Sequence, residues 1–137
     1  MDYVTISKDT INHLFSGYAS LQASPLSKEL RAFLDLRVSQ LNGCKYCCNL
    51  HRSEAIKLGV ALDKINALER FTDSNHYSDA EKEALSWAES LTKLDNIKRV
   101  EETKLNLYFN EREIVDITIC ISLMNAFNRL AISMRDE

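Results

Sequence analysis

Glycine and proline are scarce in this chain, which has three glycines and one proline among 137 residues. A sheet of several strands joined by tight turns needs these residues much more often. Apolar residues instead recur every three or four positions along most of the chain, which is the spacing of one helix face. The length suits one domain with a core of its own. We therefore expect a single all-α domain over residues 1–137, with about six to seven helices.

Local signals indicate where most of these helices begin and end. Ser24-Pro25 is typical of an N-cap followed by proline in the first helical position. The segments 78–81 and 110–113 have the pattern of a capping box, and Gly59 is a good C-terminal signal. The expected helices cover approximately residues 11–21, 25–42, 44–58, 62–68, 79–91, 99–108 and 111–134.

The last of these helices is apolar around most of its circumference. Such a helix has to be buried on nearly all sides, which is hard to achieve within one small subunit. Two interpretations remain open: the helix forms an interface between subunits of an oligomer, or it is the central helix of a bundle. Its apolar residues are Ile114, Val115, Ile117, Ile119, Cys120, Ile121, Leu123, Met124, Phe127, Leu130 and Ile132.

Charge and composition argue against several classes of function. The formal net charge is -3, so there is no basic excess to bind nucleic acid by counterion release. The segment from Met1 to Thr10 is polar and lacks the apolar core of a signal peptide. No apolar run is expected to span a membrane. We expect the chain to be cytoplasmic.

Reactive residues are concentrated in one short segment, from Asn42 to His51. This segment contains a CxxC pair, Cys44 and Cys47, and His51 follows four residues after the second cysteine. In a helix, Cys47 and His51 lie one turn apart on the same face, and Cys44 is close enough to Cys47 for a disulfide. A thiolate is the reactive form of cysteine, and an imidazole can accept the thiol proton. The segment therefore offers a nucleophile, a base and a second thiol.

The two thiols have different activating neighbours. Cys44 opens the helix, where backbone amides favour a nearby anion, whereas Cys47 has the histidine beside it. Attack of a thiolate on a peroxide O–O bond gives a sulfenic acid, and a nearby thiol condenses with it to form a disulfide. An external dithiol must then reduce the disulfide by exchange. These considerations alone leave open which cysteine attacks.

The cysteine cluster is open to two other interpretations. Cys44, Cys47, Cys48 and His51 could bind zinc, but zinc sites usually draw on two separated ligand pairs and the sequence has no second pair. The cysteines could also be purely structural. Spacing does not exclude Cys48 from the site, although a packing role is favoured, and Cys120 is expected in the core. We expect neither a metal nor a cofactor.

Arg37 lies on the same helical stripe as apolar residues and is therefore expected to be buried. A buried charge needs a partner, and Asp116, on the apolar stripe of the last helix, is the candidate. A structural role for this pair is favoured over substrate binding. Asn125, Asn128 and Arg129 are expected to extend the polar network at a subunit interface or at the rim of the site.

The sequence resembles the superfamily of carboxymuconolactone decarboxylases and AhpD-like alkylhydroperoxidases. The resemblance rests on the segment 36–47, which contains the run R-x-S-x-x-N-G-C-x-Y-C, and on His51 and Gly59. The segment 122–130 is similar to an N-x-x-N-R segment on the family's last helix. The resemblance covers roughly residues 10–135 and implies an AhpD-like helical domain that assembles into trimers or hexamers.

The resemblance also implies roles for the residues of the motif. Cys47 matches the cysteine that attacks peroxide, Cys44 the resolving cysteine, and His51 the proton-transfer histidine. Members of the CxxC branch often have a glutamate twelve residues before the first cysteine, where this chain has Ala32. Glu29, one turn earlier, is a poor substitute by position. The decarboxylating branch lacks the cysteine pair, so the resemblance does not imply a decarboxylase.

The sequence thus predicts a thiol-dependent peroxidase that reduces hydroperoxides through a cysteine pair cycling between dithiol and disulfide. Its partners would be a hydroperoxide, an external dithiol reductant, either thioredoxin-like or lipoyl-linked, and further copies of the same chain. The alternative is a non-catalytic thiol sensor or binding protein of the same fold, in which oxidation of the pair changes assembly or partner binding.

Overall fold

The computed structural model describes residues 1–135, and every regular element within them is helical. The α-helices are α1 (Tyr3–Ile6), α2 (Lys8–Ser20), α3 (Lys28–Asn42), α4 (Lys45–Lys57), α5 (Leu62–Asn66), α6 (Asp79–Lys93), α7 (Leu105–Tyr108) and α8 (Glu111–Met134). Short 3-10 turns cover Leu21–Ala23, Leu68–Asp73 and Val100–Glu102. The predicted all-α fold is confirmed. Helices α1 and α7 are single turns. The other six α-helices within residues 1–135 agree with the expected six to seven.

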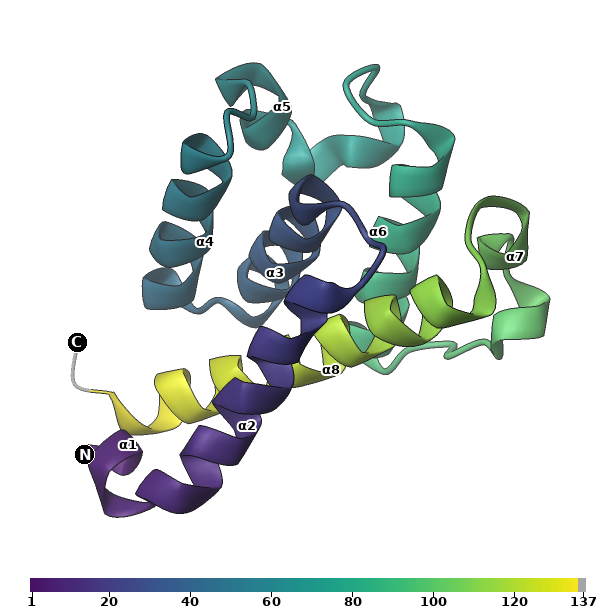
Figure 1. Ribbon diagram of the computed structural model, residues 1–137. Coiled ribbons are helices and arrows are strands. Elements are labelled where there is room, and N and C mark those ends of the chain that lie inside the picture. The colour runs from purple at the N-terminus through teal and green to yellow at the C-terminus, as the bar shows by residue number, and fades with distance from the viewer. Residues whose placement is uncertain (136–137) are drawn as a thin grey trace.

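Helix α3 is the central helix of the domain (Figure 1). It packs against α4 on one side and against α6 and α8 on the others. All residues from Leu30 to Leu36 are buried, including the charged residues Arg31 and Asp35. A helix that is surrounded by other helices buries its charged side chains along with its apolar ones. The interpretation that the last helix is the central one is therefore wrong.

Helix α8 buries one face and leaves the other open. Its inner face contributes Ile117 and Ile121 to the core. On the outer face, apolar side chains remain between 40% and 54% exposed; these are Val115, Ile119 and Ile132. By length and composition α8 could cross a membrane, contrary to expectation, but its inner face belongs to the core of the domain. The exposed apolar face of α8 is compatible with the predicted interface between subunits, which stays a prediction.

Most of the helix ends follow the local signals. Ser78 caps α6 and Asn110 caps α8, each with the reciprocal bond to a glutamate three residues later, so both predicted capping boxes are confirmed. The continuous helix predicted over residues 99–108 is wrong. That segment forms a 3-10 turn and the single-turn α7, because the backbone becomes extended at Thr103 between them.

The N-cap predicted at Ser24 is also wrong. Helix α3 begins at Lys28, and the side chain of Ser27 caps it. Ser24 accepts a hydrogen bond from the backbone N–H of Leu26 and donates one to Asp116. The Ser-Pro dipeptide therefore forms a turn ahead of the helix, and this turn ties the start of α3 to α8.

Gly43 ends α3 and directs the chain into α4, with a φ of +71°. A Cβ placed there would meet no atom within 4 Å, so any cost of a side chain comes from the backbone alone. We expect Gly43→Ala to lower the free energy of unfolding by about 1–2 kcal/mol. The matched control is Gly17→Ala, in the last turn of α2 with equally open space and no positive φ, which should stabilise by at most about 0.5–1 kcal/mol. Urea unfolding of both variants tests this, and a neutral Gly43→Ala would contradict it.

Candidate active site

The two cysteines of the CxxC motif lie at the start of α4. Cys44 is the N-cap residue and Cys47 is in the first turn. They are joined by a disulfide, with Cα atoms 5.2 Å apart. The backbone N–H of Cys47 points at the sulfur of Cys44, 3.3 Å away, as it would at any N-cap acceptor. The start of the helix therefore permits the disulfide that the spacing suggested.

An apolar cavity of about 310 Å³ gives access to one of the two cysteines. Cys47 and His51 are both part of its wall, whereas Cys44 is not. The remaining wall comes mainly from α1, α2 and α8 and includes Ile11, Phe15, Phe127 and Leu130. A small apolar molecule in this cavity would meet Cys47 first.

His51 is buried beside two carboxyl groups. Its Nδ1 lies 2.9 Å from Glu54 Oε2 and 4.0 Å from Asp35 Oδ2. The hydroxyl of Tyr18 and the thiol of Cys120 both donate hydrogen bonds to the Asp35 carboxyl group, the thiol at 3.2 Å. A chain of polar groups from α2, α3 and α4 therefore ends at the histidine in the cavity wall.

Burial controls the protonation of this polar chain. It raises the pKa of Asp35 above its ordinary value. The nearby His51, the donors Tyr18 and Cys120, and the charge of Arg31 oppose only part of that effect. Burial, followed by the proximity of Asp35, also raises the pKa of Tyr18 and that of the Cys120 thiol. Asp35 therefore keeps its proton to a higher pH than a solvated aspartate does. A carboxyl group of this kind beside an imidazole can exchange protons with it.

Sequence reasoning did not single out Asp35 or Glu54. Glu29, a poor substitute by position for the carboxylate missing at Ala32, pairs with Lys64 at 2.8 Å and takes no part in the site. Asp35 follows Ala32 by one helical turn on α3, so the two positions share a face. The sequence signal that could have found the site was the carboxyl group three residues after Ala32, at Asp35, rather than the one three residues before it, at Glu29.

The predicted pair between Arg37 and Asp116 is wrong. Arg37 is largely buried, as predicted, but it pairs with Glu89 on α6 at 3.2 Å. Asp116 accepts hydrogen bonds from Ser24 and Arg112. Burial alone would raise the pKa of Asp116, but these two donors, together with the charge of Arg31, lower it below its ordinary value. Neither Arg37 nor Asp116 lines the cavity. The face of α3 that carries Arg37 is turned toward α6, and Asp116 faces Ser24 at the turn before α3.

Asn125, Asn128 and Arg129 do form a polar network, and it lies behind the CxxC segment. The fully buried Asn128 donates to Ser39 Oγ at 3.1 Å and accepts from Asn42 at 3.0 Å. Asn125 accepts from Asn42 and from Arg129. Ser39 and Asn42 are the serine and asparagine of the R-x-S-x-x-N-G run, and their hydrogen bonds to Asn125 and Asn128 hold the end of α3 against α8.

Asn128 is expected to be the energetically dominant member of this network. Asn128→Ala would remove one hydrogen bond from the Asn42 amide, which keeps its bond to Asn125, and one from the buried Ser39 hydroxyl, which keeps its bond to the Asp35 carbonyl. The loss of these two bonds at a buried position should cost about 1–3 kcal/mol of stability. The matched control is Arg129→Ala, which removes an exposed side chain of the same network and should change stability by less than about 0.5 kcal/mol. Urea unfolding measures both. Equal losses would show that burial of Asn128 does not dominate.

The other cysteines lie outside the disulfide. Cys48 packs against the main core, and burial together with the nearby Glu69 raises the pKa of its thiol, which agrees with the favoured packing role. Cys120 is fully buried, as predicted, although its contact with Asp35 was not foreseen. Because Cys48 packs into the core, the cysteines and His51 do not converge on one point as zinc ligands would.

Within residues 1–135, one set of residues has the geometry to hold a cation. Asp35, His51 and Glu54 offer ligand atoms that lie within 4.8 Å of one another, and carboxylate and imidazole are common metal ligands. In this structure the carboxyl group of Asp35 accepts a hydrogen bond from Tyr18, and Glu54 is hydrogen-bonded to His51. These hydrogen bonds account for the cluster without a metal.

Fold and site together define a helical domain of the AhpD-like class with a disulfide-bonded CxxC pair. Residues 9–90, more than half of the chain, match the carboxymuconolactone decarboxylase family, and the chain belongs to this family. It is 28% identical to YdfG of Bacillus subtilis, an uncharacterized protein, over 98% of this chain and 92% of the relative.

Two crystal structures have the same fold. One is a protein of unknown function from Agrobacterium tumefaciens, provisionally assigned to antioxidant defence as AhpD, with 27% identity and a TM-score of 0.92 over 100% of this chain and 95% of that one. The other is an uncharacterized peroxidase-related protein from Silicibacter, with 25% identity and a TM-score of 0.81 over 91% and 68% of the respective chains. The AhpD-like fold expected from the sequence is thereby confirmed.

Proposed function

We propose that this protein is a thiol-dependent peroxidase that reduces hydroperoxides through Cys44 and Cys47. The observation that carries the proposal is the disulfide at the start of α4, with Cys47 and His51 both in the wall of one apolar cavity. The relatives assigned to antioxidant defence and described as peroxidase-related support the same class of reaction.

The proposed reaction starts from the reduced pair. The Cys47 thiol gives its proton to His51, and the thiolate attacks one oxygen of the hydroperoxide O–O bond. The bond breaks, the other oxygen leaves as an alcohol after taking up a proton, and Cys47 becomes a sulfenic acid. The Cys44 thiol then attacks the Cys47 sulfur and displaces water. The sum is one hydroperoxide and one dithiol giving one alcohol, one water and one disulfide.

An external dithiol closes the cycle by thiol–disulfide exchange. Its class, thioredoxin-like or lipoyl-linked, is part of the proposal, as is the cytoplasmic location that would supply it. The proposed assembly into trimers or hexamers would cover the open apolar face of α8, where Val115, Ile119 and Ile132 are exposed. Light scattering in solution tests the assembly separately from activity.

The chain's own residues give the cavity two functions in this proposal. The apolar wall excludes water from the sulfenic acid and so limits its further oxidation. Asp35, with its raised pKa, supports proton transfer at His51 in the place of the carboxyl group that Ala32 lacks. Glu54 holds the imidazole in position through its bond to Nδ1.

Steady-state turnover tests the proposal. Reduced protein is supplied with hydrogen peroxide or cumene hydroperoxide and with either dihydrolipoamide or a thioredoxin system, and peroxide consumption is followed together with intact mass. We expect many turnovers per subunit and loss of two hydrogen atoms from the mass once reductant is exhausted. The Cys48→Ser variant is the control and should behave as the wild type. Oxidation that stops after one equivalent with every dithiol would overturn the peroxidase and favour the thiol sensor.

A further inference from the structure

A second pocket, which is polar, lies beside the polar chain of the active site. It contains a buried cation, Arg31, whose side chain has no ion pair within residues 1–135. The Arg31 side chain is on the central helix α3 and is only 9% exposed. Its Nε–H is buried and has no hydrogen-bond partner, and the guanidinium forms no ion pair with any carboxylate within residues 1–135. The guanidinium lies over the face of the Tyr18 ring, 5.8 Å from the ring centre, and its charge acts at longer range on the carboxyl groups of Asp35 and Asp116.

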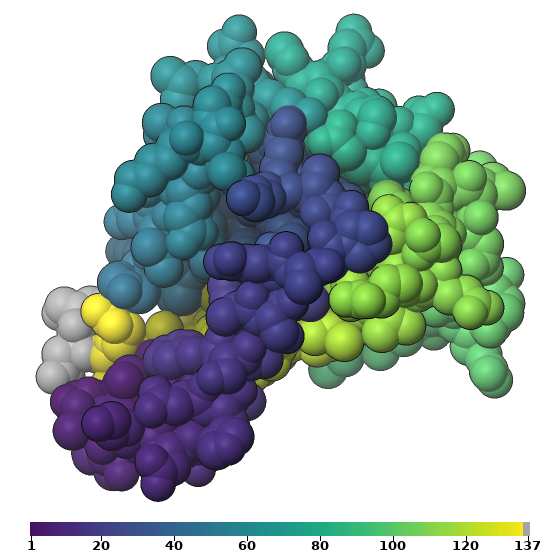
Figure 2. All heavy atoms as spheres, in the orientation of Figure 1, coloured from purple at the N-terminus to yellow at the C-terminus, as the bar shows by residue number. Residues whose placement is uncertain are grey.

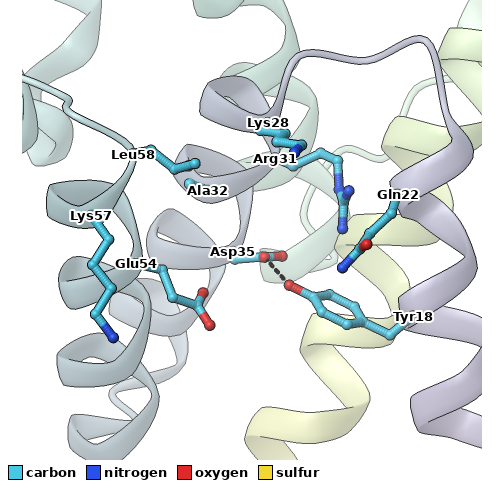
Figure 3. Close-up of a pocket in the computed structure, with 9 residues that line it drawn as sticks. All are labelled: Tyr18, Gln22, Lys28, Arg31, Ala32, Asp35, Glu54, Lys57 and Leu58. Atoms are coloured by element: carbon cyan, nitrogen blue, oxygen red, sulfur yellow. Dashed lines mark hydrogen bonds between the residues drawn. The ribbon is translucent and has the colours of Figure 1, made fainter.

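The space beside Arg31 is large enough for a small molecule. The pocket has a volume of about 360 Å³ and lies between α2, α3 and α4, where Figure 2 shows the surface hollowed between α4 and the end of α2. In Figure 3 the guanidinium of Arg31 is directed into this space, toward the amide of Gln22 and the Tyr18 hydroxyl. Lys28 and Lys57 also line the pocket.

Two carboxyl groups in the same wall limit the charge that the pocket can accept. Asp35 is bonded to Tyr18 and holds its proton to a higher pH than usual, whereas Glu54 is paired with His51. The lining residues thus leave an excess of positive charge, but the Glu54 carboxylate would repel a dianion. A planar monoanion matches both the charge and the forked donors of a guanidinium.

We propose that this pocket binds the carboxylate of a small organic acid, with Arg31 as the principal partner and Gln22 and Lys28 as additional donors. A buried guanidinium without an acceptor is unfavourable in the free protein, and a carboxylate would supply the missing acceptor. The pocket shares Tyr18 and Glu54 with the cavity at Cys47, so the bound acid would lie against the active-site wall. The proposal does not depend on turnover at the cysteine pair.

Binding of hexanoate and of its neutral isostere hexanamide tests the proposal on the intact protein. The Arg31 Nε–H resonance in a ¹H–¹⁵N spectrum, assigned by its loss in Arg31→Gln, reports directly on the new hydrogen bond. We expect hexanoate to shift this resonance saturably and to bind at least ten-fold more tightly than hexanamide. Arg31→Gln should weaken hexanoate binding at least ten-fold. The matched control Lys98→Gln, an exposed charge outside the pocket, should change it less than two-fold.

Several outcomes would overturn the proposal. Equal binding of acid and amide, or unchanged binding in Arg31→Gln, would remove Arg31 as an anion partner. Inorganic phosphate that binds more tightly than hexanoate would assign the pocket to an inorganic anion instead. If Arg31→Gln does not fold, Arg31→Lys keeps the charge but loses the fork, and at least three-fold weaker binding of hexanoate is then required.

Discussion

Replacing Cys47 with serine is expected to abolish hydroperoxide turnover, with a loss of at least about 10³-fold. A serine hydroxyl does not ionise near neutral pH and cannot form a sulfenic acid, so neither step of the proposed cycle can begin. The cavity reaches Cys47 and not Cys44, which is why this cysteine should matter most. The measurement is steady-state peroxide consumption with a dithiol reductant, with circular dichroism to verify folding.

Cys44→Ser is the matched comparison, because it removes the other half of the same disulfide. It should still react once with a hydroperoxide, and the sulfenic acid at Cys47 should be trapped by dimedone and detected by intact mass. Cys47→Ser should give no such adduct. Trapping in Cys47→Ser and none in Cys44→Ser would reverse the assignment of the attacking and resolving thiols.

Most of the features that depend on local sequence could be predicted, although the N-cap at Ser24 and the helix over residues 99–108 were not among them. The capping boxes at Ser78 and Asn110 and the α4 start at Cys44 need only neighbours within one turn, and the structure contains them. The CxxC pair and His51 also share one short helix, so their proximity follows from helix geometry alone.

The parts that depend on how helices pack could not be predicted in the same way. Arg37 was expected to be buried, and it is, but its partner is Glu89 on α6 because α3 turns that face toward α6. Asp35 follows the buried Leu34 on the central helix, and nothing local distinguishes a buried aspartate from a surface one. Its partners Tyr18 and Cys120 are 17 and 85 residues away in sequence.

Asp35→Asn is expected to lower peroxide turnover by about 10²-fold, which is the lower end of the usual contribution of positioned proton transfer. The substitution keeps the shape of the side chain and one acceptor oxygen, which can still accept from Tyr18 but then no longer from Cys120. It removes the carboxyl group that lies 4.0 Å from His51. Steady-state kinetics of the two proteins at several pH values measures the effect. Wild-type turnover in Asp35→Asn would remove Asp35 from the proposed proton transfer.

The same variant should change how stability depends on pH. Because burial raises the pKa of Asp35 in the folded protein, the folded state holds the proton where the unfolded chain has lost it. The wild type should therefore lose stability relative to Asp35→Asn as pH rises above about 4, by at most about 1.4 kcal/mol per pH unit, until the pKa of Asp35 in the folded protein is passed.

Asp116, whose pKa is lowered in the folded protein, should have the opposite effect on how stability depends on pH. The wild type should lose stability relative to Asp116→Asn as pH falls below about 4. Urea unfolding across this range measures both, and parallel curves for the wild type and Asp35→Asn would show that Asp35 ionises in the folded protein as freely as in water.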